Sequence, residues 1–370
     1  MGRMQCRRLK YLLLLLTVCL CLEFPGVRAQ YVAPSRKEMV RLKAMVKEGE
    51  VKKWYDSLLG IANAALAEAP QPIDTIRTEG LLQGDPRKTA TWNALQDMRK
   101  MYALAVAWRV TGRKEYLNKT SVYFIAWADS NYSRGDPIDD TNLDPAIEAF
   151  DMVKDGLVPG EIKRISGWLR RTGEAEMNAV YNRPERATSH NNWHSHRLKI
   201  VGEIGFAIGD KTLQDYAIKG IRQQIGRNLL PDGSSEDFHT RDALHYHVYD
   251  LEPLLKLAIV LRRATDSDYY RYEAPSGASL ARSVEWLLPY LDGRQTHAEF
   301  VNSTVGFDRK RAENGEAGYK SGTLFNPRSG ITTLLLASYF DAEKLALARQ
   351  LIGTEDTYPA WQAVVNAVER

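Results

Sequence analysis

The chain has 370 residues, of which 44% are hydrophobic and 26% are charged. A chain of this length can bury a core large enough to fold without disulfides. Its 50 Lys and Arg residues nearly balance its 46 Asp and Glu residues, and it has no basic tail, so we expect no nucleic-acid partner.

Residues 1–29 have the layout of a secretory signal peptide. Four basic residues precede an apolar run from Tyr11 to Leu22, and Val27-Arg28-Ala29 places small residues at the usual −3 and −1 positions. We expect cleavage after Ala29 and a secreted or periplasmic protein with no membrane association after processing. The alternative is an uncleaved membrane anchor, for which the apolar run is short.

Processing changes both the cysteine count and the charge. All three cysteines (Cys6, Cys19 and Cys21) lie in the first 29 residues, so the mature chain has none and cannot form disulfides. The same segment contains five basic residues and one acidic residue, which leaves 45 of each afterwards. An anionic partner would therefore need a groove in which basic residues gather.

Helical periodicity dominates residues 30–370. Ser35-Arg36-Lys37-Glu38 is a capping box that opens a long amphipathic stretch to about Glu68. Further helices are predicted at Leu95–Val110, Tyr116–Ala128, Asp144–Lys154, Glu161–Tyr181, Trp193–Ile208, Leu213–Asn228, Ala243–Arg263, Ala278–Leu288 and Ala342–Leu351.

Short turns join these helices, at Gly135-Asp136-Pro137, Pro231-Asp232-Gly233 and Pro275-Ser276-Gly277. The polar, Gly-rich stretch Asp308–Tyr319 is predicted to be a long loop. Many helices of similar length predict an all-α fold, a single domain over 30–370 built as an α/α barrel (toroid) of helical hairpins. A helical solenoid is the alternative, although no repeat is visible.

A first polar window occupies the start of a predicted helix and contains three of the seven histidines. Two asparagines there can cap the helix, or they can present amide donors to a carboxylate. We favour the second interpretation because several groups that need hydrogen-bond partners stand in one run. The candidate residues are Asn191, Asn192, Trp193, His194, His196 and Arg197.

A second window, Asp237–Tyr249, contains three more histidines. On one continuous helix, Arg241, His245 and Tyr249 would share a face, with Tyr246 on the adjoining one. An aromatic face packed in the core is the alternative, but Leu244, Leu251 and Leu254 already provide a core stripe. We therefore predict a lined pocket.

A third group of candidates lies in a polar stretch before the second long helix. Arg87 and Lys88 could contact carboxylates there, and Trp92 could contact a sugar face. An ordinary solvated loop with one anchoring tryptophan is an equally good interpretation.

Two of these segments resemble a known family. Ala243–Leu254 resembles the Tyr-His-x-Tyr segment of the alginate lyase family, polysaccharide lyase family 5. Asn191-Asn192, followed by a helix ending at Gly209-Asp210, resembles the Asn-Asn-His segment of the same superfamily. The resemblance spans about residues 92–341.

The chain also departs from that family. Trp193 stands where family 5 has histidine, and the nearest histidine is His194. The family's arginine seven residues before its tyrosine would fall on Asp242, one residue after Arg241. The segments Asn-Asn-Trp and Arg-Asp-Ala-Leu-His-Tyr look closer to the glucuronan/alginate lyases of polysaccharide lyase family 38.

The resemblance implies a lyase that cleaves a 1,4-linked uronate polymer, alginate (polymannuronate) or glucuronan, by β-elimination without a cofactor. Donors must neutralise the uronate carboxylate, and Asn192, His194 and Arg241 are suitable. One tyrosine can remove the C5 proton and protonate O4, because both lie on one ring face of mannuronate and glucuronate. The resemblance favours Tyr249, with Tyr246 second.

The other window residues, Asn191, Trp193, His196, Arg197 and His245, would then bind the anionic polysaccharide, together with Arg87 and Lys88. Guluronate would need a base on the opposite ring face, which a histidine could provide. We expect the protein to be a monomer.

Three other functions remain open. The histidines could bind zinc, with His190 and His194 at helical i, i+4 spacing, but no His-Glu-x-x-His arrangement is present and we expect no metal. A glycoside hydrolase would need two opposed carboxylates, from candidates such as Asp140, Glu203, Glu236 and Asp237. A non-catalytic polysaccharide-binding protein would not need the Asn/His/Arg/Tyr grouping.

Overall fold

The computed structural model describes residues 30–353 and 361–368. The described part is helical, with one antiparallel pair of two-residue strands, β1 (Ala298–Glu299) and β2 (Thr323–Leu324). The longer α-helices are α2 (Arg36–Met45), α3 (Gly49–Ala67), α5 (Gln96–Thr111), α6 (Lys114–Ser130), α8 (Asp144–Val153), α9 (Pro159–Asn178), α10 (Asn192–Ile208), α11 (Lys211–Asn228), α13 (Leu244–Thr265) and α14 (Leu280–Leu291). The shorter ones are α4 (Pro86–Ala94), α7 (Pro137–Asp140), α12 (Glu236–Arg241), α15 (Gly306–Glu313), α16 (Ile331–Ala337), α17 (Lys344–Ile352) and α18 (Trp361–Val368).

The all-α prediction is confirmed. The closure of the helices into an α/α barrel and the single-domain span of 30–370 stay predictions. The predicted signal peptide, 1–29, lies outside the described residues. No helix in the described ranges is both long enough and apolar enough to cross a bilayer.

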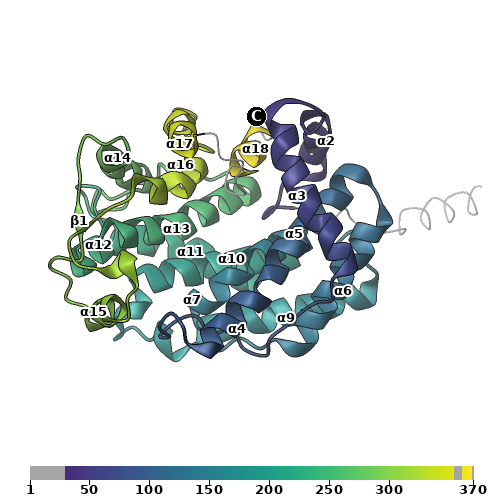
Figure 1. Cartoon of the computed structure of the whole chain (residues 1–370), viewed down its shortest axis with the longest axis horizontal. Coiled ribbons are helices and arrows are strands. Elements are labelled where there is room, and N and C mark those ends of the chain that lie inside the picture. Colours follow the sequence, from purple (N-terminus) through teal and green to yellow (C-terminus); the bar gives the residue numbers. More distant parts are fainter. Residues whose placement is uncertain (1–29, 354–360, 369–370) are drawn as a thin grey trace, which may run out of the picture.

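Three long helices, α5, α10 and α13, run through the middle of the molecule (Figure 1). The first and last helices of the described part lie together on one side, where α18 lies beside α2 and α3. At the opposite end α12, α14, α15 and β1 gather around the start of α13. A large hydrophobic cluster with members from Val32 to Val368 holds the central helices by packing on several sides. A smaller cluster of Ala243, Tyr246 and Phe300 lies at the start of α13.

Local sequence explains several helix boundaries. The predicted capping box at the start of α2 is present, since Ser35 and Glu38 each accept the other's backbone N–H. The stretch predicted to run unbroken to Glu68 is divided, however, because α2 ends at Met45 and α3 begins at Gly49. Gly49 has a φ of 70°, a left-handed conformation that glycine adopts at little cost.

The prediction of a long loop at Asp308–Tyr319 is wrong. This stretch contains most of α15 and the short 3₁₀ helix η4 (Ala317–Tyr319). The charged residues hid the helix because few of its positions are apolar, and its order comes from contacts that Asp308 and Arg311 make with other elements. Local pattern cannot reveal such contacts.

Candidate active site

A cavity of about 330 Å³ lies between the starts of α10 and α13 and the segment that carries α15 and η4. Eight of the residues predicted from sequence line it. They are Lys88, Trp92, Asn192, Trp193, Arg241, His245, Tyr246 and Tyr249. The other lining residues are Thr78, Glu79, Ile138, Thr141, Asn142, Arg311 and Tyr319.

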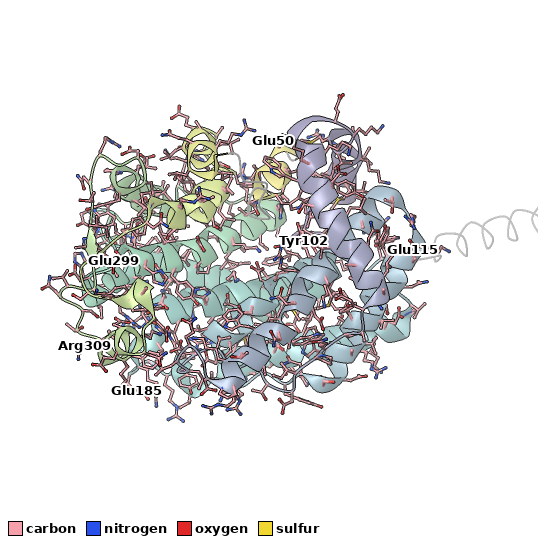
Figure 2. All side chains as sticks on the ribbon, in the orientation of Figure 1. Glu50, Tyr102, Glu115, Glu185, Glu299 and Arg309 are labelled. Carbon is pink, nitrogen blue, oxygen red and sulfur yellow. The ribbon has the colours of Figure 1, made fainter. Side chains whose placement is uncertain are left out.

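The helix predicted at Ala243–Arg263 is present as α13, but the chain turns sharply between α12 and α13. Arg241 therefore does not share a continuous helix face with His245 and Tyr249, contrary to expectation. Asp242 adopts a left-handed conformation with a φ of 47°, which ends α12. Glu299, at the end of the molecule formed by β1 and α12 (Figure 2), then caps α13. Its carboxylate accepts the backbone N–H groups of Leu244 at 2.7 Å and His245 at 3.0 Å.

The turn folds Arg241 back over Tyr246. The Arg241 guanidinium lies 4.0 Å from the centre of the Tyr246 ring and donates to its hydroxyl at 2.9 Å. Arg311 donates to the same hydroxyl at 2.9 Å, and Asp308 accepts from Arg241 at 2.5 Å. Tyr246 is buried, and its hydroxyl accepts hydrogen bonds from both arginines. Burial raises the Tyr246 pKa, and the two nearby guanidiniums partly oppose this effect.

Tyr249 lies one helical turn further on and is less enclosed. Its ring is parallel to that of His245, with centroids 6.3 Å apart, and it also contacts the His196 ring at 4.3 Å. Its hydroxyl has no hydrogen-bond partner among the described residues, so it is available to a bound molecule. Burial raises the Tyr249 pKa, Glu79 raises it further, and Arg311 lowers it.

Asn192 is fixed by a buried carboxylate. Asp237 accepts the Asn192 backbone N–H at 2.7 Å and also one N–H of its side-chain amide. Asn228 donates to the same carboxylate at 2.9 Å. The Asn192 amide therefore has a set orientation at the cavity wall. Its second side-chain N–H has no hydrogen-bond partner among the described residues and is available to a ligand.

The charged groups that line the cavity are mainly cationic. Lys88, Arg241 and Arg311 contribute three positive charges, whereas Glu79 is the only carboxylate among the described lining residues. Glu79 lies 3.6 Å from the Arg311 guanidinium. Trp92, which is 45% exposed, contributes an aromatic surface. Such a lining suits a sugar that carries a carboxylate.

Residues 42–297 match the profile of the alginate lyase family. The chain belongs to the alginate lyase family. As a member of this family it is a polysaccharide lyase.

Relatives agree with this assignment. Over 236 residues the chain is 27% identical to a polysaccharide lyase from Stenotrophomonas maltophilia, covering 58% of this chain and 70% of that protein. An alginate lyase from Bacteroides ovatus is similar in structure with a TM-score of 0.68 and 16% identity, covering 91% of this chain and 99% of the other. Alginate lyase A1-III from Sphingomonas species A1 has a TM-score of 0.55 and 18% identity, over 72% of this chain and 80% of the other. At these identities the solved structures show a shared fold.

Two residues predicted from the first window lie away from the cavity of this alginate lyase family member. His194 packs edge-on against Tyr216, with centroids 6.4 Å apart, and burial lowers its pKa to about 3. Arg197 is fully buried and lies 3.3 Å from Glu176. Both point away because α10 turns by about 100° per residue, so positions two and five after Asn192 leave its face.

Three other predicted residues have local roles. Asn191 caps α10, because its side chain accepts the Trp193 backbone N–H at 3.0 Å. Arg87 is exposed and paired with Asp85, the cap of α4. His196 is buried behind Tyr249, where it lines a second cavity.

Sequence reasoning missed three residues of the site: Glu79, Arg311 and Tyr319. Arg311 and Tyr319 lie in the stretch taken for a loop, beyond the end of the family match at residue 297. Glu79 lies in an irregular segment before α4. A basic run at 309–311 was visible, but nothing in it singles out the arginine that faces the cavity.

Among the described residues, no group of three His, Cys, Asp or Glu side chains is arranged to hold a metal ion. His247 lies in the core, where its ring nitrogens bond Ser235 at 2.9 Å and the Ser283 carbonyl at 3.2 Å. His194 and His247 therefore face different neighbours rather than a common point.

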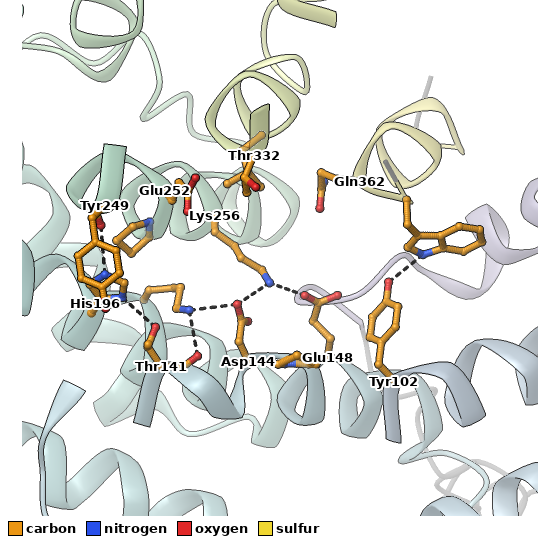
Figure 3. A pocket seen from close by; sticks show the side chains of 15 residues that line it. Tyr102, Thr141, Asp144, Glu148, His196, Tyr249, Glu252, Lys256, Thr332 and Gln362 are labelled. Carbon is orange, nitrogen blue, oxygen red and sulfur yellow. Dashed lines mark hydrogen bonds and ion pairs between the residues drawn. The ribbon is translucent and has the colours of Figure 1, made fainter. Parts of the chain in front are cut away.

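The second cavity, of about 370 Å³, shares Thr141 and Tyr249 with the first (Figure 3). Lys256 reaches across it from α13 to Asp144 at 2.7 Å and to Glu148 on α8. Lys199 donates to Asp144 at 3.0 Å. Both ammonium groups are thus neutralised within the protein.

Glu252 in the second cavity should make stability depend on pH. Burial raises its pKa to about 7, so the folded state binds its proton more tightly than the unfolded state, whose carboxyl has an ordinary pKa near 4.5. The stability that protonated Glu252 adds to the folded state is fully present below the unfolded pKa. It is lost as the pH rises through the folded pKa of about 7. Glu252→Gln should therefore leave stability unchanged at acidic pH and raise it by about 3 kcal/mol at pH ~8.

Denaturant unfolding of both proteins at the two pH values measures this difference. A gain of equal size at both pH values would mean that the substitution acts through packing and not through the charge of Glu252.

Proposed function

We propose that this chain cleaves a 1,4-linked uronate polymer, polymannuronate or a close relative, by β-elimination at the first cavity. The observation that carries the proposal is the Tyr249 hydroxyl, which is unbonded among the described residues and lies in a cavity with three cationic side chains. A tetrasaccharide complex of a variant of alginate lyase A1-III, with a TM-score of 0.54 to this chain, is consistent with a saccharide ligand.

The chemistry needs a neutralised carboxylate and one proton carrier. The Tyr249 phenolate removes the C5 proton of the uronate, and the electrons left on C5 form the C4–C5 double bond as the C4–O4 bond breaks. The tyrosine then returns its proton to O4 of the leaving sugar. The Asn192 amide and the cations of the cavity stabilise the charge that builds up on the carboxylate.

The phenolate form must be made accessible, because burial raises the Tyr249 pKa. Arg311 favours the phenolate, and a bound uronate that displaces water would reduce the screening between the Arg311 charge and the phenolate. Tyr246, by contrast, has a hydroxyl that already bonds Arg241 and Arg311, so we assign it to holding these two side chains.

A hydrolase is less well supported. The candidate carboxylates Asp140, Glu203, Glu236 and Asp237 do not line the first cavity, which among its described residues has the single carboxylate of Glu79. A hydrolytic mechanism of the usual kind needs two.

Ultraviolet absorbance of reactions with polymannuronate, polyguluronate, glucuronan and a glycosaminoglycan tests the proposal. The conjugated C4–C5 double bond should absorb in reactions with polymannuronate or glucuronan, which differ only at C2. Chain shortening without new absorbance would indicate a hydrolase. A response to polyguluronate alone would mean that the base lies on the opposite ring face and is not Tyr249.

A further inference from the structure

Tyr249 sits at an unusual place in α13. Residue 253, four positions later, is a proline inside the helix. Proline has no N–H, so the carbonyl of Tyr249 loses its normal partner in the helix, and the proline ring pushes this carbonyl off the helix axis. A buried carbonyl of this kind needs another donor.

His196 on α10 is that donor. Its Nε2 lies 3.1 Å from the Tyr249 carbonyl oxygen, and its Nδ1 lies 2.8 Å from the Thr141 hydroxyl. A carbonyl can only accept, so the ring proton is on Nε2, and Nδ1 then accepts from Thr141. Burial lowers the His196 pKa to about 3, which agrees with a neutral ring.

The same histidine also links the proposed carboxylate donor Asn192 on α10 to the proposed proton carrier Tyr249 on α13. Asn192 and His196 are four residues apart on α10, so they lie on one face of that helix. Asn192 lines the first cavity while His196 contacts both the ring and the carbonyl of Tyr249. Thr141, at the start of η1 (Thr141–Leu143), lines both cavities and holds the His196 ring from the other side.

We propose that His196 is a positioning residue for Tyr249, because it supplies the N–H that Pro253 cannot and so fixes the tyrosine relative to Asn192. The inference rests on the proposed function, in which Tyr249 carries the proton. It assigns His196 a role through the backbone of the tyrosine, in place of the substrate contact expected from sequence.

A double-mutant cycle separates this role from simple packing. His196→Ala should lower kcat by about 100-fold and change KM little, since a small misplacement of a catalytic group costs about that much. Adding Pro253→Ala restores a helical N–H to the Tyr249 carbonyl. The double variant should therefore recover at least about tenfold of the kcat lost in His196→Ala.

His247→Ala is the matched control. His247 is another buried neutral histidine, but it bonds Ser235 and Ser283 and not the Tyr249 carbonyl. Pro253→Ala should give no recovery in that background. His196→Gln, which keeps an N–H donor, should retain more activity than His196→Ala. If thermal melting shows that the alanine variant does not fold, His196→Phe, which keeps a ring beside Tyr249 but has no N–H donor, replaces it in the cycle.

Two results would overturn the inference: a kcat for His196→Ala close to that of the wild type, or a loss that Pro253→Ala fails to relieve. Both results count against the inference only if the wild-type protein is active on a uronate polymer. A wild-type protein without lyase activity, or an active Tyr249→Phe variant, would instead overturn the proposed function.

Discussion

Replacing Tyr249 by Phe is expected to lower kcat by about 10³-fold or more, because one hydroxyl both removes and returns the proton. The ring contacts with His245 and His196 should survive, since they do not involve the oxygen. The hydroxyl has no partner in the described part of the chain, so its removal should change the melting temperature little. Initial rates on the cleaved polymer and thermal melting measure both effects.

Tyr246→Phe is the matched control for this substitution. It removes a hydroxyl that Arg241 and Arg311 hold, so it should lower stability and reduce the rate less than Tyr249→Phe does. If Tyr246→Phe abolishes turnover while Tyr249→Phe keeps it, Tyr246 is the proton carrier and the assignment of the two tyrosines is reversed.

Local pattern was sufficient for the helices that carry most of the site. The apolar stripe of Leu244, Leu251 and Leu254 is fully buried, and it fixes which face of α13 turns to the core. Tyr246 and Tyr249 then had to face elsewhere, and both line the first cavity. Periodicity gives this phase without any knowledge of the neighbouring helices.

The helical periodicity of α10 is also enough to predict which of its histidines shares a face with Asn192. With Asn192 facing the cavity, a residue two positions later points about 200° away, and one four positions later returns to nearly the same face. This argument excludes His194 and keeps His196. Residue type alone gave His194 the role of neutralising the carboxylate and His196 only a substrate contact.

The break between α12 and α13 could not be seen locally. The left-handed Asp242 is held by contacts from a distant segment: its carboxylate accepts the Asn302 N–H at 2.8 Å, and its carbonyl accepts the Phe300 N–H at 2.7 Å. Glu299 from the same segment caps α13. Sequence separation of this size hides such a turn, although the turn is what brings Arg241 onto Tyr246.

Substitution of Arg311, which sequence reasoning missed, should have the second large effect on activity. It bonds the Tyr246 hydroxyl, lies near Glu79, and covers the Tyr319 ring with 4.6 Å between guanidinium and ring centre. Arg311→Ala should lower kcat/KM by about 100-fold, as removal of one charge-stabilising donor does elsewhere. Arg311→Lys should lose less, because it keeps the charge but not the planar fork.

Arg309→Ala is the control for Arg311, since Arg309 lies on the same helix but at the exposed edge of the molecule (Figure 2). Its nearest polar partner is the Ser303 carbonyl at 3.4 Å, and the variant should keep the wild-type rate. Equal losses in the two variants would mean that α15 acts through its fold and not through the Arg311 charge.

The direction in which the pH–rate profile shifts separates the effect of charge from an effect of packing. Arg311 lowers the Tyr249 pKa and Glu79 raises it. At any pH below that pKa, Arg311→Ala should therefore leave less phenolate and Glu79→Gln more. The rising limb of kcat/KM against pH should move to higher pH in the first variant and to lower pH in the second. Shifts in the same direction would show that Tyr249 is not the group whose ionisation limits the rate, because these opposite charges can act on one phenol only with opposite sign.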